Sequence, residues 1–383
     1  MNITIDIRCL MQANYSGVSE YAFNLLDNLF KIDSQNQYQL FYNSHQDISN
    51  NLPDFNYPNV KFFGFKYPNK FFNLGLKLLR YPKIDKILPP ADIFFMPNLN
   101  FIALRAGGKK TITIHDLSFD LFPSFFSLKR QLWHKFINPR KLNAGFDKII
   151  AVSDNTKNDL MNLYQLPGQK IKVIHSGLDH NLYKPLDKND PKFLEIKAKY
   201  QLPESFILFL GTLEPRKNLT GIIEAFNLLK NNNSQLADLH LLIAGAPGWN
   251  YKKIFEIANN SPYTKQIFYL DYISRQDKPY LYNLARAFIF PSFYEGFGFP
   301  ALEAQACGLP VMAANNSAFP EILGDSAFLV NPDHLEEIAA SLNEILSNQE
   351  LKQDLINKGL ENAKRFSWEK CAQKTLDYLT LNS

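Results

Sequence analysis

The chain has 383 residues, which is too long for one ordinary hydrophobic core and suggests two domains. Apolar residues make up 46% and charged residues 20%, a mixture typical of globular rather than disordered proteins. The 41 basic and 37 acidic residues leave a net charge of +4, too weak to indicate nucleic acid as a partner. The three cysteines lie far apart, so neither a disulfide framework nor a zinc site is indicated.

The N-terminus alternates like a strand and lacks the basic and long apolar regions of a signal peptide. No stretch of the chain approaches the roughly 18 apolar residues of a membrane span. We therefore expect a cytoplasmic protein, either soluble or bound peripherally to a membrane.

Short β-branched or aromatic runs alternate with segments of helical period through most of the chain. The first strand is expected at 2–10, followed by a loop centred on Gly17 and a helix with one apolar face. Further strands of the first half are expected at 38–42, 60–63, 92–96, 111–115, 148–152 and 172–175. This alternation predicts an α/β fold, a doubly wound parallel sheet covered by helices on both faces.

A second half with the same pattern follows a polar, proline-containing stretch at 176–203, where we place the domain junction. Its strands are expected at 206–210, 240–244, 267–270, 287–291, 310–313 and 327–330, and the tail from Asp333 onward is expected to be helical. In open α/β sheets, ligands bind outside the carboxyl ends of the strands, so the functional residues are sought in the loops that follow them.

One such loop lies in the segment PSFYEGFGFPALEAQACGLPV, residues 291–311. Gly296 and Gly298 leave room for a ligand to approach backbone amides, and a helix expected to begin near Pro300 offers free N–H groups. Glu295 precedes the turn, and Glu303 is expected in the first helical turn. One carboxylate can bind sugar hydroxyls and the other the ribose of a sugar nucleotide; an acidic helix cap is the structural alternative.

A second loop lies in FLGTLEPRKNLTGIIEAF, residues 209–226, where Arg216 and Lys217 follow a strand and precede a helix. Asn218 is the expected helix cap. Two fixed cations can stabilise a departing diphosphate without a metal ion. The alternative is a solvated basic pair on a surface loop.

A third loop begins with His115, at the end of the strand in TITIHDLSF. A histidine at a strand end can orient a substrate hydroxyl or help to move a proton, although a buried and satisfied histidine is an equal alternative. Gly17 is a weaker signal, a glycine turn through which backbone can approach phosphate, or else an ordinary loop. No GxGxxG follows a strand and no Asp-x-Asp is present, so we expect no dinucleotide cofactor and no metal ion.

Together these motifs resemble glycosyltransferase family 4, also called group 1, whose retaining enzymes have the GT-B fold of two facing Rossmann-like domains with an interdomain cleft. The resemblance rests on the E-x7-E pattern of Glu295 and Glu303, and on GTLEPRKN at 211–218, AGAPGW at 244–249 and FSWEKCA at 366–372. It implies an acceptor-binding domain at 1–180, a donor-binding domain at 181–365, and a final helix at 366–383 that crosses back to the first domain.

The resemblance also implies roles for the site residues. Glu295 is expected to contact the donor sugar and support the reacting centre, Glu303 to hold the ribose, and Arg216 with Lys217 to bind the diphosphate. Backbone amides that bind sugar and phosphate are implied at Gly296, Phe297, Gly298 and Phe299. His115 is expected to face the reacting sugar, and Gly17 to belong to a loop that closes on the diphosphate.

Three positions depart from the family pattern. Ser16-Gly17 stands where many members have Gly-Gly, and Ser176-Gly177 stands where many have Asn-Gly. Thr212 occupies a position where some relatives have arginine. Diphosphate binding must therefore depend more strongly on Arg216 and Lys217.

GTLEPRKN with AGAPGW is most similar to mannosyltransferases of surface polysaccharide assembly. This similarity implies GDP-mannose as the donor and a glycan or lipid-linked acceptor, with retention of the anomeric configuration. Two other functions stay open at this point: a non-catalytic subunit that binds nucleotide sugars or glycans, and a GT-B-type epimerase of sugar nucleotides.

A basic and aromatic segment lies at 66–88 in the first half. It holds a single acid, Asp85, against Lys66, Lys70, Lys77, Arg80, Lys83 and Lys86. Such a segment can bind an anionic membrane surface, which places the protein on the inner face of the plasma membrane. A solvated helix packed on the sheet of the first domain is the alternative.

Overall fold

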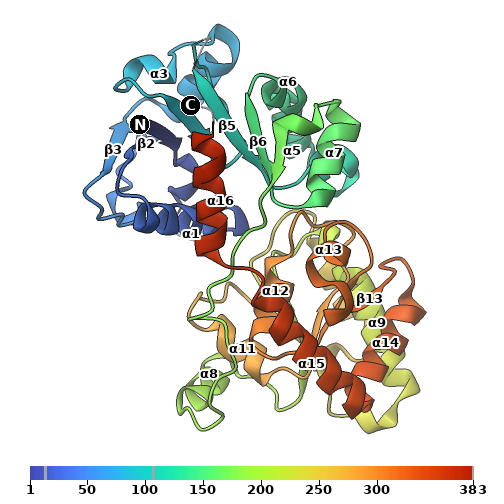
Figure 1. Cartoon of the computed structure of the whole chain (residues 1–383). Helices are drawn as coiled ribbons and strands as arrows, with labels where there is room; N and C mark the ends of the chain where they lie inside the picture. Colours follow the sequence, from blue (N-terminus) through green and yellow to red (C-terminus); the bar gives the residue numbers. More distant parts are fainter. Residues whose placement is uncertain (13–14, 106–107, 382–383) are drawn as a thin grey trace. The chain divides into compact units, whose positions relative to one another are not determined.

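The computed structural model of the protein describes residues 1–12, 15–105 and 108–381. The chain forms two compact units, each built on one parallel sheet with helices packed against it (Figure 1). The first unit comprises Met1–Leu117, Lys129–Gly177 and Ser367–Ser383, and the second comprises Ser118–Leu128 and Leu178–Phe366. The predicted α/β class with two doubly wound sheets is confirmed.

The first unit holds a seven-stranded sheet in the order β3-β2-β1-β4-β5-β6-β7, in which all paired strands are parallel. Its strands are β1 (Asn2–Asp6), β2 (Gln37–Asn43), β3 (Val60–Phe65), β4 (Ile93–Met96), β5 (Lys109–Ile114), β6 (Lys148–Ala151) and β7 (Ile171–Val173). Its central strands are buried apolar runs, as expected where helices cover both faces.

The first strand is shorter than the predicted 2–10. It ends at Asp6, and Arg8–Leu10 forms a 3₁₀ turn. The Arg8 guanidinium folds back onto the Asp6 carboxylate at 2.5 Å. The pattern of alternation continued past the strand because Leu10, in the turn, is also buried.

The helices of the first unit include α1 (Gly17–Ile32), whose apolar face is buried as the sequence predicted. The others are α2 (Asn69–Leu74), the π-helical turn η3 (Gly75–Leu79), α3 (Ile84–Ile87), α5 (Leu128–Ile137), α6 (Pro139–Ala144), α7 (Asp154–Tyr164) and α16 (Trp368–Thr380). Leu128, the first residue of α5, is grouped with the second unit.

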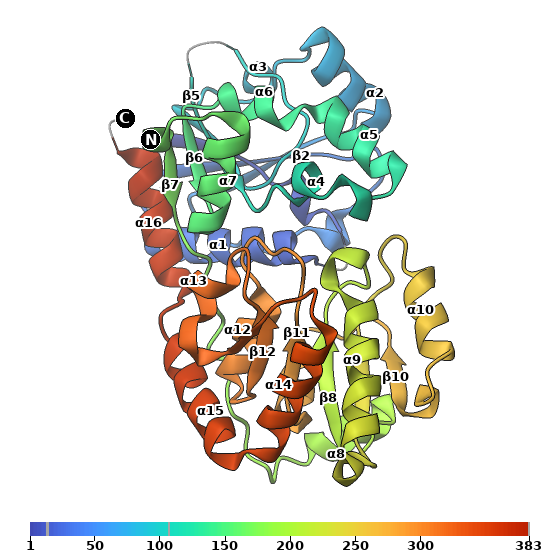
Figure 2. The ribbon, with the colours of Figure 1, turned by 90° about the vertical axis from the view of Figure 1, so that its right-hand side faces the viewer.

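The C-terminal helix α16 lies beside α1 in the first unit (Figure 2). Lys148 at the start of β6 donates to the carbonyl oxygen of Tyr378 near the end of this helix, at 2.6 Å. Gly177 accommodates the entry into α16, because a Cβ atom there would lie 2.3 Å from the backbone nitrogen of Trp368. The glycine of the Ser176-Gly177 pair is therefore required by a close backbone approach.

The second unit holds a six-stranded parallel sheet in the order β10-β9-β8-β11-β12-β13. Its strands are β8 (Phe206–Leu210), β9 (His240–Ala244), β10 (Ile267–Leu270), β11 (Phe288–Phe290), β12 (Val311–Ala314) and β13 (Phe328–Val330). Its helices are α4 (Ser118–Leu121), α8 (Lys192–Tyr200), α9 (Leu219–Asn232), α10 (Lys252–Asn259), α11 (Lys278–Leu284), α12 (Phe299–Ala306), α13 (Phe319–Leu323), α14 (Leu335–Ser347) and α15 (Gln349–Ala363).

One segment belongs to a different unit from its neighbours in the chain. Ser118–Leu128 packs with the second unit, although the residues on both sides belong to the first. The predicted boundary near residue 180 had put this segment in the first domain. Hydrophobic periodicity places an element along the chain but does not say which sheet its side chains contact.

Candidate functional site

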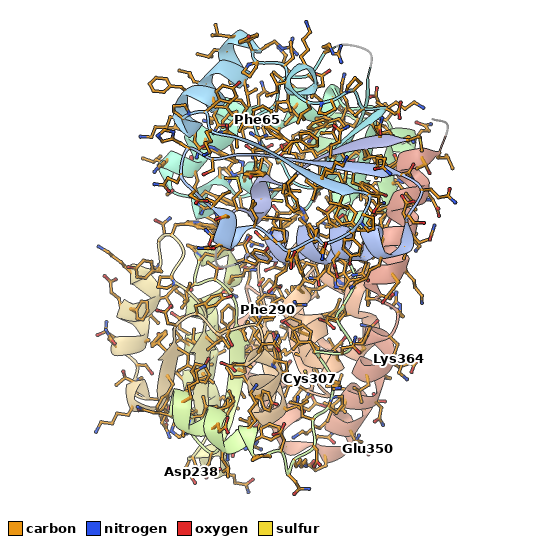
Figure 3. The ribbon with its side chains drawn as sticks, turned by 90° about the vertical axis from the view of Figure 1, so that its left-hand side faces the viewer. Phe65, Asp238, Phe290, Cys307, Glu350 and Lys364 are labelled. Atoms are coloured by element: carbon orange, nitrogen blue, oxygen red, sulfur yellow. The ribbon has the colours of Figure 1, made fainter. Side chains whose placement is uncertain are left out.

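The Arg216–Lys217 pair follows β8 in the 3₁₀ turn η6 (Pro215–Lys217). Lys217 is only 8% exposed, and its ammonium lies 5.0 Å from the ring centroid of Phe290, the last residue of β11 (Figure 3). The alternative of a solvated basic pair is therefore wrong. Both cations are held where water is largely excluded, so their charges act more strongly than on a surface.

Glu295 receives both cations. The Lys217 ammonium donates to Oε1 of Glu295, and Nη1 of Arg216 lies 3.2 Å from Oε2. Arg216 is also paired with Glu214, which is 2% exposed, at 2.7 Å. Two cations and two carboxylates thus form one buried cluster with balanced charge, which offsets the cost of desolvating each group.

The pKa of Lys217 is held below its usual value. Burial lowers it most, the neighbouring Arg216 charge lowers it further, and the Glu295 and Glu214 carboxylates oppose the change. Desolvation disfavours the charged ammonium, whereas a carboxylate partner favours it. The charge of Lys217 therefore depends on its anionic partners. A cation of this kind can bind an anionic ligand in place of such a partner.

Sheet topology brings the two loops together. Strand β11 is the neighbour of β8, so the carboxyl ends of both strands lie at one edge of the sheet. The amide of Phe293 donates to the carbonyl oxygen of Arg216 at 2.9 Å, and Nη1 of Arg216 donates to the carbonyl oxygen of Tyr294 at 2.5 Å. These bonds fix the backbone before Glu295 against the loop that carries the cations.

The glycine turn after Glu295 leads into α12, which begins at Phe299 with Pro300 in its first turn. Gly298 has φ +94°, and a Cβ atom there would lie 2.7 Å from the Phe319 ring, so only glycine fits. Gly296, Phe297 and Gly298 are buried. The amides predicted to bind sugar and phosphate thus lie in a tightly packed turn at a helix N-terminus.

Glu303 lies in the second turn of α12, not in the first as predicted, because the helix begins at Phe299. It is 3% exposed and accepts a hydrogen bond of 2.8 Å from the Tyr282 hydroxyl. The Lys278 ammonium lies 4.0 Å from its other oxygen. An acidic cap on the helix dipole, the structural alternative, does not describe a buried carboxylate one turn inside the helix.

The helix after Lys217 does not use its expected cap. Asn218 occupies the N-cap position with φ 57°, but its side chain makes no cap hydrogen bond. Its Nδ2 donates instead to the carbonyl oxygen of Pro332 at 2.7 Å. The side chain therefore ties the loop of Lys217 to the chain that follows β13.

His115 and Gly17 belong to the first unit. Nε2 of His115 lies 2.9 Å from the carbonyl oxygen of Pro97, and its ring packs edge-on against Tyr21 at 4.7 Å between centroids. A carbonyl can only accept, so Nε2 carries a proton. Burial lowers the pKa of His115, and the Pro97 carbonyl only partly opposes this. The ring is thus held neutral, with Nδ1 as a hydrogen-bond acceptor.

Gly17 is the first residue of α1 rather than the centre of a loop. The Oγ of Ser16 accepts a hydrogen bond from the amide of Ser19, so serine at this position supplies a helix cap. The departure from Gly-Gly therefore has a structural reason in this chain.

The second unit brings Arg216, Lys217 and Glu295 into contact and places Glu303 beyond the glycine turn. Three further residues contact these side chains: Glu214 pairs with Arg216, and Lys278 and Tyr282 approach Glu303. Glu214 could have been found from its place in GTLEPRKN, two residues before Arg216. Lys278 and Tyr282 lie on α11, far from the motifs in sequence, and no sequence signal identified them.

Comparisons with known proteins agree with these features. Residues 192–362 match the family described as "Glycosyl transferases group 1", and residues 15–182 match "Glycosyltransferase Family 4". The O-antigen chain mannosyltransferase B of Escherichia coli is 32% identical over 284 residues, which cover 73% of this chain and 72% of that protein. The chain belongs to glycosyltransferase family 4. It is therefore an enzyme, as the sequence predicted.

A second relative of this glycosyltransferase is the serotype-specific mannosyltransferase WbdA of Escherichia coli, which is 28% identical over 235 residues. The matched region covers 29% of the WbdA chain. Two solved structures share the fold over nearly their whole length. They are sucrose-phosphate synthase of Thermosynechococcus elongatus (TM-score 0.76, 18% identity, 98% of each chain) and Anabaena HepE with UDP-glucose (TM-score 0.73, 19% identity, 99% of each chain). These likenesses support the predicted GT-B fold.

The glycosyltransferase has a basic and apolar surface on its first unit, which we call the α2–α5 face. Exposed apolar side chains of α2, of η3 and the residues just after it, and of α5 form it: Phe71, Leu74, Leu78, Leu79, Tyr81, Leu132, Trp133 and Phe136. Lys77 of η3 joins the elements, because its ammonium donates to the carbonyl oxygen of Ile137 at 3.0 Å and lies over the Phe136 ring. Within the described part of the chain, no helix is both long and apolar enough to span a membrane.

Proposed function

We propose that this glycosyltransferase transfers mannose from GDP-mannose to a glycan or lipid-linked acceptor in cell-surface polysaccharide synthesis, with retention and without a metal ion. The observation that carries the proposal is the buried cluster of Arg216, Lys217 and Glu295. The similarity to an O-antigen mannosyltransferase supports the choice of sugar and pathway. The UDP-glucose named with HepE supports a nucleotide sugar as the class of donor.

In this mechanism the donor diphosphate replaces Glu295 as the partner of Arg216 and Lys217. The cations then stabilise the negative charge that develops on the leaving group, in a site already depleted of water. Glu295, released from the cations, accepts hydrogen bonds from the donor sugar. The cluster is neutral without the donor. The negative charge of the diphosphate drives this exchange, because it replaces the Glu295 carboxylate beside the two cations.

The remaining residues bind and orient. Glu303, held by Tyr282, accepts from the two ribose hydroxyls, and the amides of 296–299 donate to sugar and phosphate oxygens. His115, neutral with Nδ1 free of the Pro97 bond, accepts from a hydroxyl of the reacting sugar. No carboxylate is assigned as a covalent nucleophile, so the proposed path to retention is a front-face displacement with an ion-pair-like transition state.

The test uses the full chain treated with EDTA and offered GDP-mannose or UDP-glucose with lipid-linked and free oligosaccharide acceptors. We expect transfer from GDP-mannose with EDTA present, and a product with the anomeric configuration of the donor by NMR. Glu295→Gln should abolish turnover while the fold is kept. The matched control breaks the exposed Glu361–Lys364 pair at the end of α15 by Glu361→Gln (Figure 3 shows Lys364).

Each part of the proposal has its own contradicting result. Transfer only after a divalent metal is restored would refute metal independence. A higher rate with UDP-glucose would refute the donor. Epimerisation of the donor without any acceptor would replace transfer by the alternative chemistry.

We also propose that the α2–α5 face binds the anionic inner surface of the plasma membrane, where a lipid-linked acceptor resides. Phe71 and Leu79 are 76% and 77% exposed. The exposed cation Lys70 precedes Phe71, and the exposed cation Arg80 follows Leu79. The single acid of 66–88, Asp85, is paired with Arg105 at 2.9 Å. Apolar side chains surrounded by cations suit the boundary between acyl chains and anionic headgroups.

Co-sedimentation with vesicles of anionic lipid tests this face. Leu78→Ser with Leu79→Ser should weaken binding, whereas Leu194→Ser, an equally exposed leucine on α8, should not. Equal binding of both variants would contradict the proposal. Lys77 is unsuitable for this test, because its replacement also breaks the bond to Ile137.

A further inference from the structure

The segment Ser118–Leu128 packs on the second unit through aromatic side chains. The ring of Phe126 stacks on Trp249 with 5.3 Å between centroids and 19° between planes. The indole N–H of Trp249 donates to the carbonyl oxygen of Phe125. A stacked ring and a directed hydrogen bond together fix both the position and the orientation of Trp249.

The same segment contacts the backbone turn that carries Glu295. The ring of Phe125 stacks on Phe293 at 5.4 Å and 25°, and Phe122 packs against Tyr294 at 5.7 Å. These two partners directly precede Glu295 in the chain. The segment therefore contacts both the Glu295 turn and Trp249.

The Glu295 turn is in turn bonded to Arg216. As described above, the amide of Phe293 donates to the Arg216 carbonyl, and the Arg216 guanidinium donates to the Tyr294 carbonyl. A shift of Phe293 or Tyr294 therefore moves a hydrogen-bond partner of Arg216 directly.

The loop that bears Trp249 is joined just as tightly to the cation loop. The amide of Leu213 donates to Ala246 O at 3.1 Å, and the amide of Gly248 donates to Leu213 O at 3.0 Å. A Cβ atom at Gly248 would lie 2.8 Å from the Thr212 side chain, and one at Gly245 would lie 2.0 Å from the Gly211 carbonyl oxygen. Trp249 and the residues that lead to Arg216 therefore have little freedom to move relative to one another.

We propose that Ser118–Leu128 and Trp249 form a positioning element of the donor site, which holds Arg216 in place. The inference rests on the proposed function in that Arg216 binds the diphosphate. It adds Trp249, Phe125 and Phe126, which are not expected to touch the donor, as residues that act through Arg216. Displacing a catalytic group by about 1 Å can reduce a rate by roughly 100-fold, so such positioning has measurable consequences.

Two substitutions of Trp249 test the element. Trp249→Leu removes the stack on Phe126 and the hydrogen bond to Phe125, and should lower kcat/KM roughly 10-fold to 100-fold. Trp249→Phe keeps a ring on Phe126 but loses the hydrogen bond, so it should restore most of the lost activity. The control is Phe268→Leu, whose ring packs against His240 at the amino ends of β9 and β10, and it should leave kcat/KM within about 2-fold of the parent enzyme.

A double-mutant cycle separates positioning from a general loss of stability. Trp249→Leu acts through Arg216, so in an Arg216→Ala background it should lower kcat/KM by no more than about 2-fold further. Thermal unfolding of each variant shows whether the protein is folded under the assay conditions. Should Trp249→Leu not fold, Trp249→Phe enters the same cycle with a smaller expected effect.

The outcomes distinguish this inference from the proposed function. Independent, multiplying effects of Trp249→Leu and Arg216→Ala would overturn the inference while leaving the role of Arg216 intact. An unchanged kcat/KM in Trp249→Leu would also overturn it. If Arg216→Ala alone had no effect, the proposed role of Arg216 would fail. The kcat/KM of Trp249→Leu compared with that of Phe268→Leu would then decide whether Trp249 positions another part of the site.

Discussion

Two groups of basic residues in this protein have opposite surroundings. Lys217 is buried and Arg216 is largely covered, and both contact carboxylates. Lys70 and Arg80 of the α2–α5 face are exposed among exposed apolar side chains. In the sequence Arg216 and Lys217 are adjacent, whereas Lys70 and Arg80 stand apart, next to Phe71 and Tyr81 respectively.

Burial, not the number of charges, sets how strongly each of these cations interacts with an anion. Buried charges interact through a medium of low effective dielectric constant, so each needs a partner and binds an anionic ligand strongly. Exposed charges are screened over about 8 Å at physiological salt, so they act weakly and together. A single buried lysine should therefore matter more than several exposed ones.

The largest effect is expected for Lys217→Ala. It should lower kcat/KM by roughly 100-fold to 1000-fold, because a cation that stabilises the leaving group is lost. It should also lower the free energy of unfolding by about 3 kcal/mol, since Glu295 keeps a buried charge with one partner fewer. Kinetics and denaturant unfolding measure the two changes.

The double variant Lys217→Met with Glu295→Gln is the matched control for that result. Removing both members of the pair should recover much of the stability but none of the activity. Stability that stayed low in the double variant would contradict the pairing, and activity that returned would contradict the roles of both residues.

The next effect is a shift of the pH profile. Because burial holds the pKa of Lys217 below its usual 10.5, rising pH removes its charge earlier than that of an exposed lysine. kcat/KM should therefore fall on the alkaline side at a pH below 10.5. Lys217→Arg stays protonated throughout and should move this fall to higher pH. Identical alkaline limbs in both proteins would show that another group titrates.

A smaller effect is expected for Tyr282→Phe, which removes one hydroxyl from a buried carboxylate. Glu303 then lacks the 2.8 Å hydrogen bond that orients it, and the KM for the donor should rise roughly 10-fold with little change in kcat. Tyr280→Phe, two residues away with its hydroxyl on Asp190, is the control. A fall in kcat alone would place Glu303 at the reacting sugar rather than at the ribose.

The smallest effect on catalysis is expected for charge reversal on the α2–α5 face. Lys70→Glu with Arg80→Glu should weaken binding to anionic vesicles by roughly 10-fold at low salt and by less at high salt. kcat/KM with a water-soluble acceptor should stay unchanged. Vesicle binding that does not depend on salt would show that the apolar side chains alone hold the protein.

Local sequence patterns predicted the two parallel sheets and the position of nearly every strand, because each strand is a short buried run between helices of clear period. The sequence also predicted Glu295, Glu303, Arg216 and Lys217 as site residues, since ligands bind at strand ends in an α/β fold, and their roles stay predictions. The burial of these residues and the contributions of Lys278 and Tyr282 came from the tertiary structure. So did the placement of Ser118–Leu128. These features depend on contacts between residues far apart in the chain, which no local pattern records.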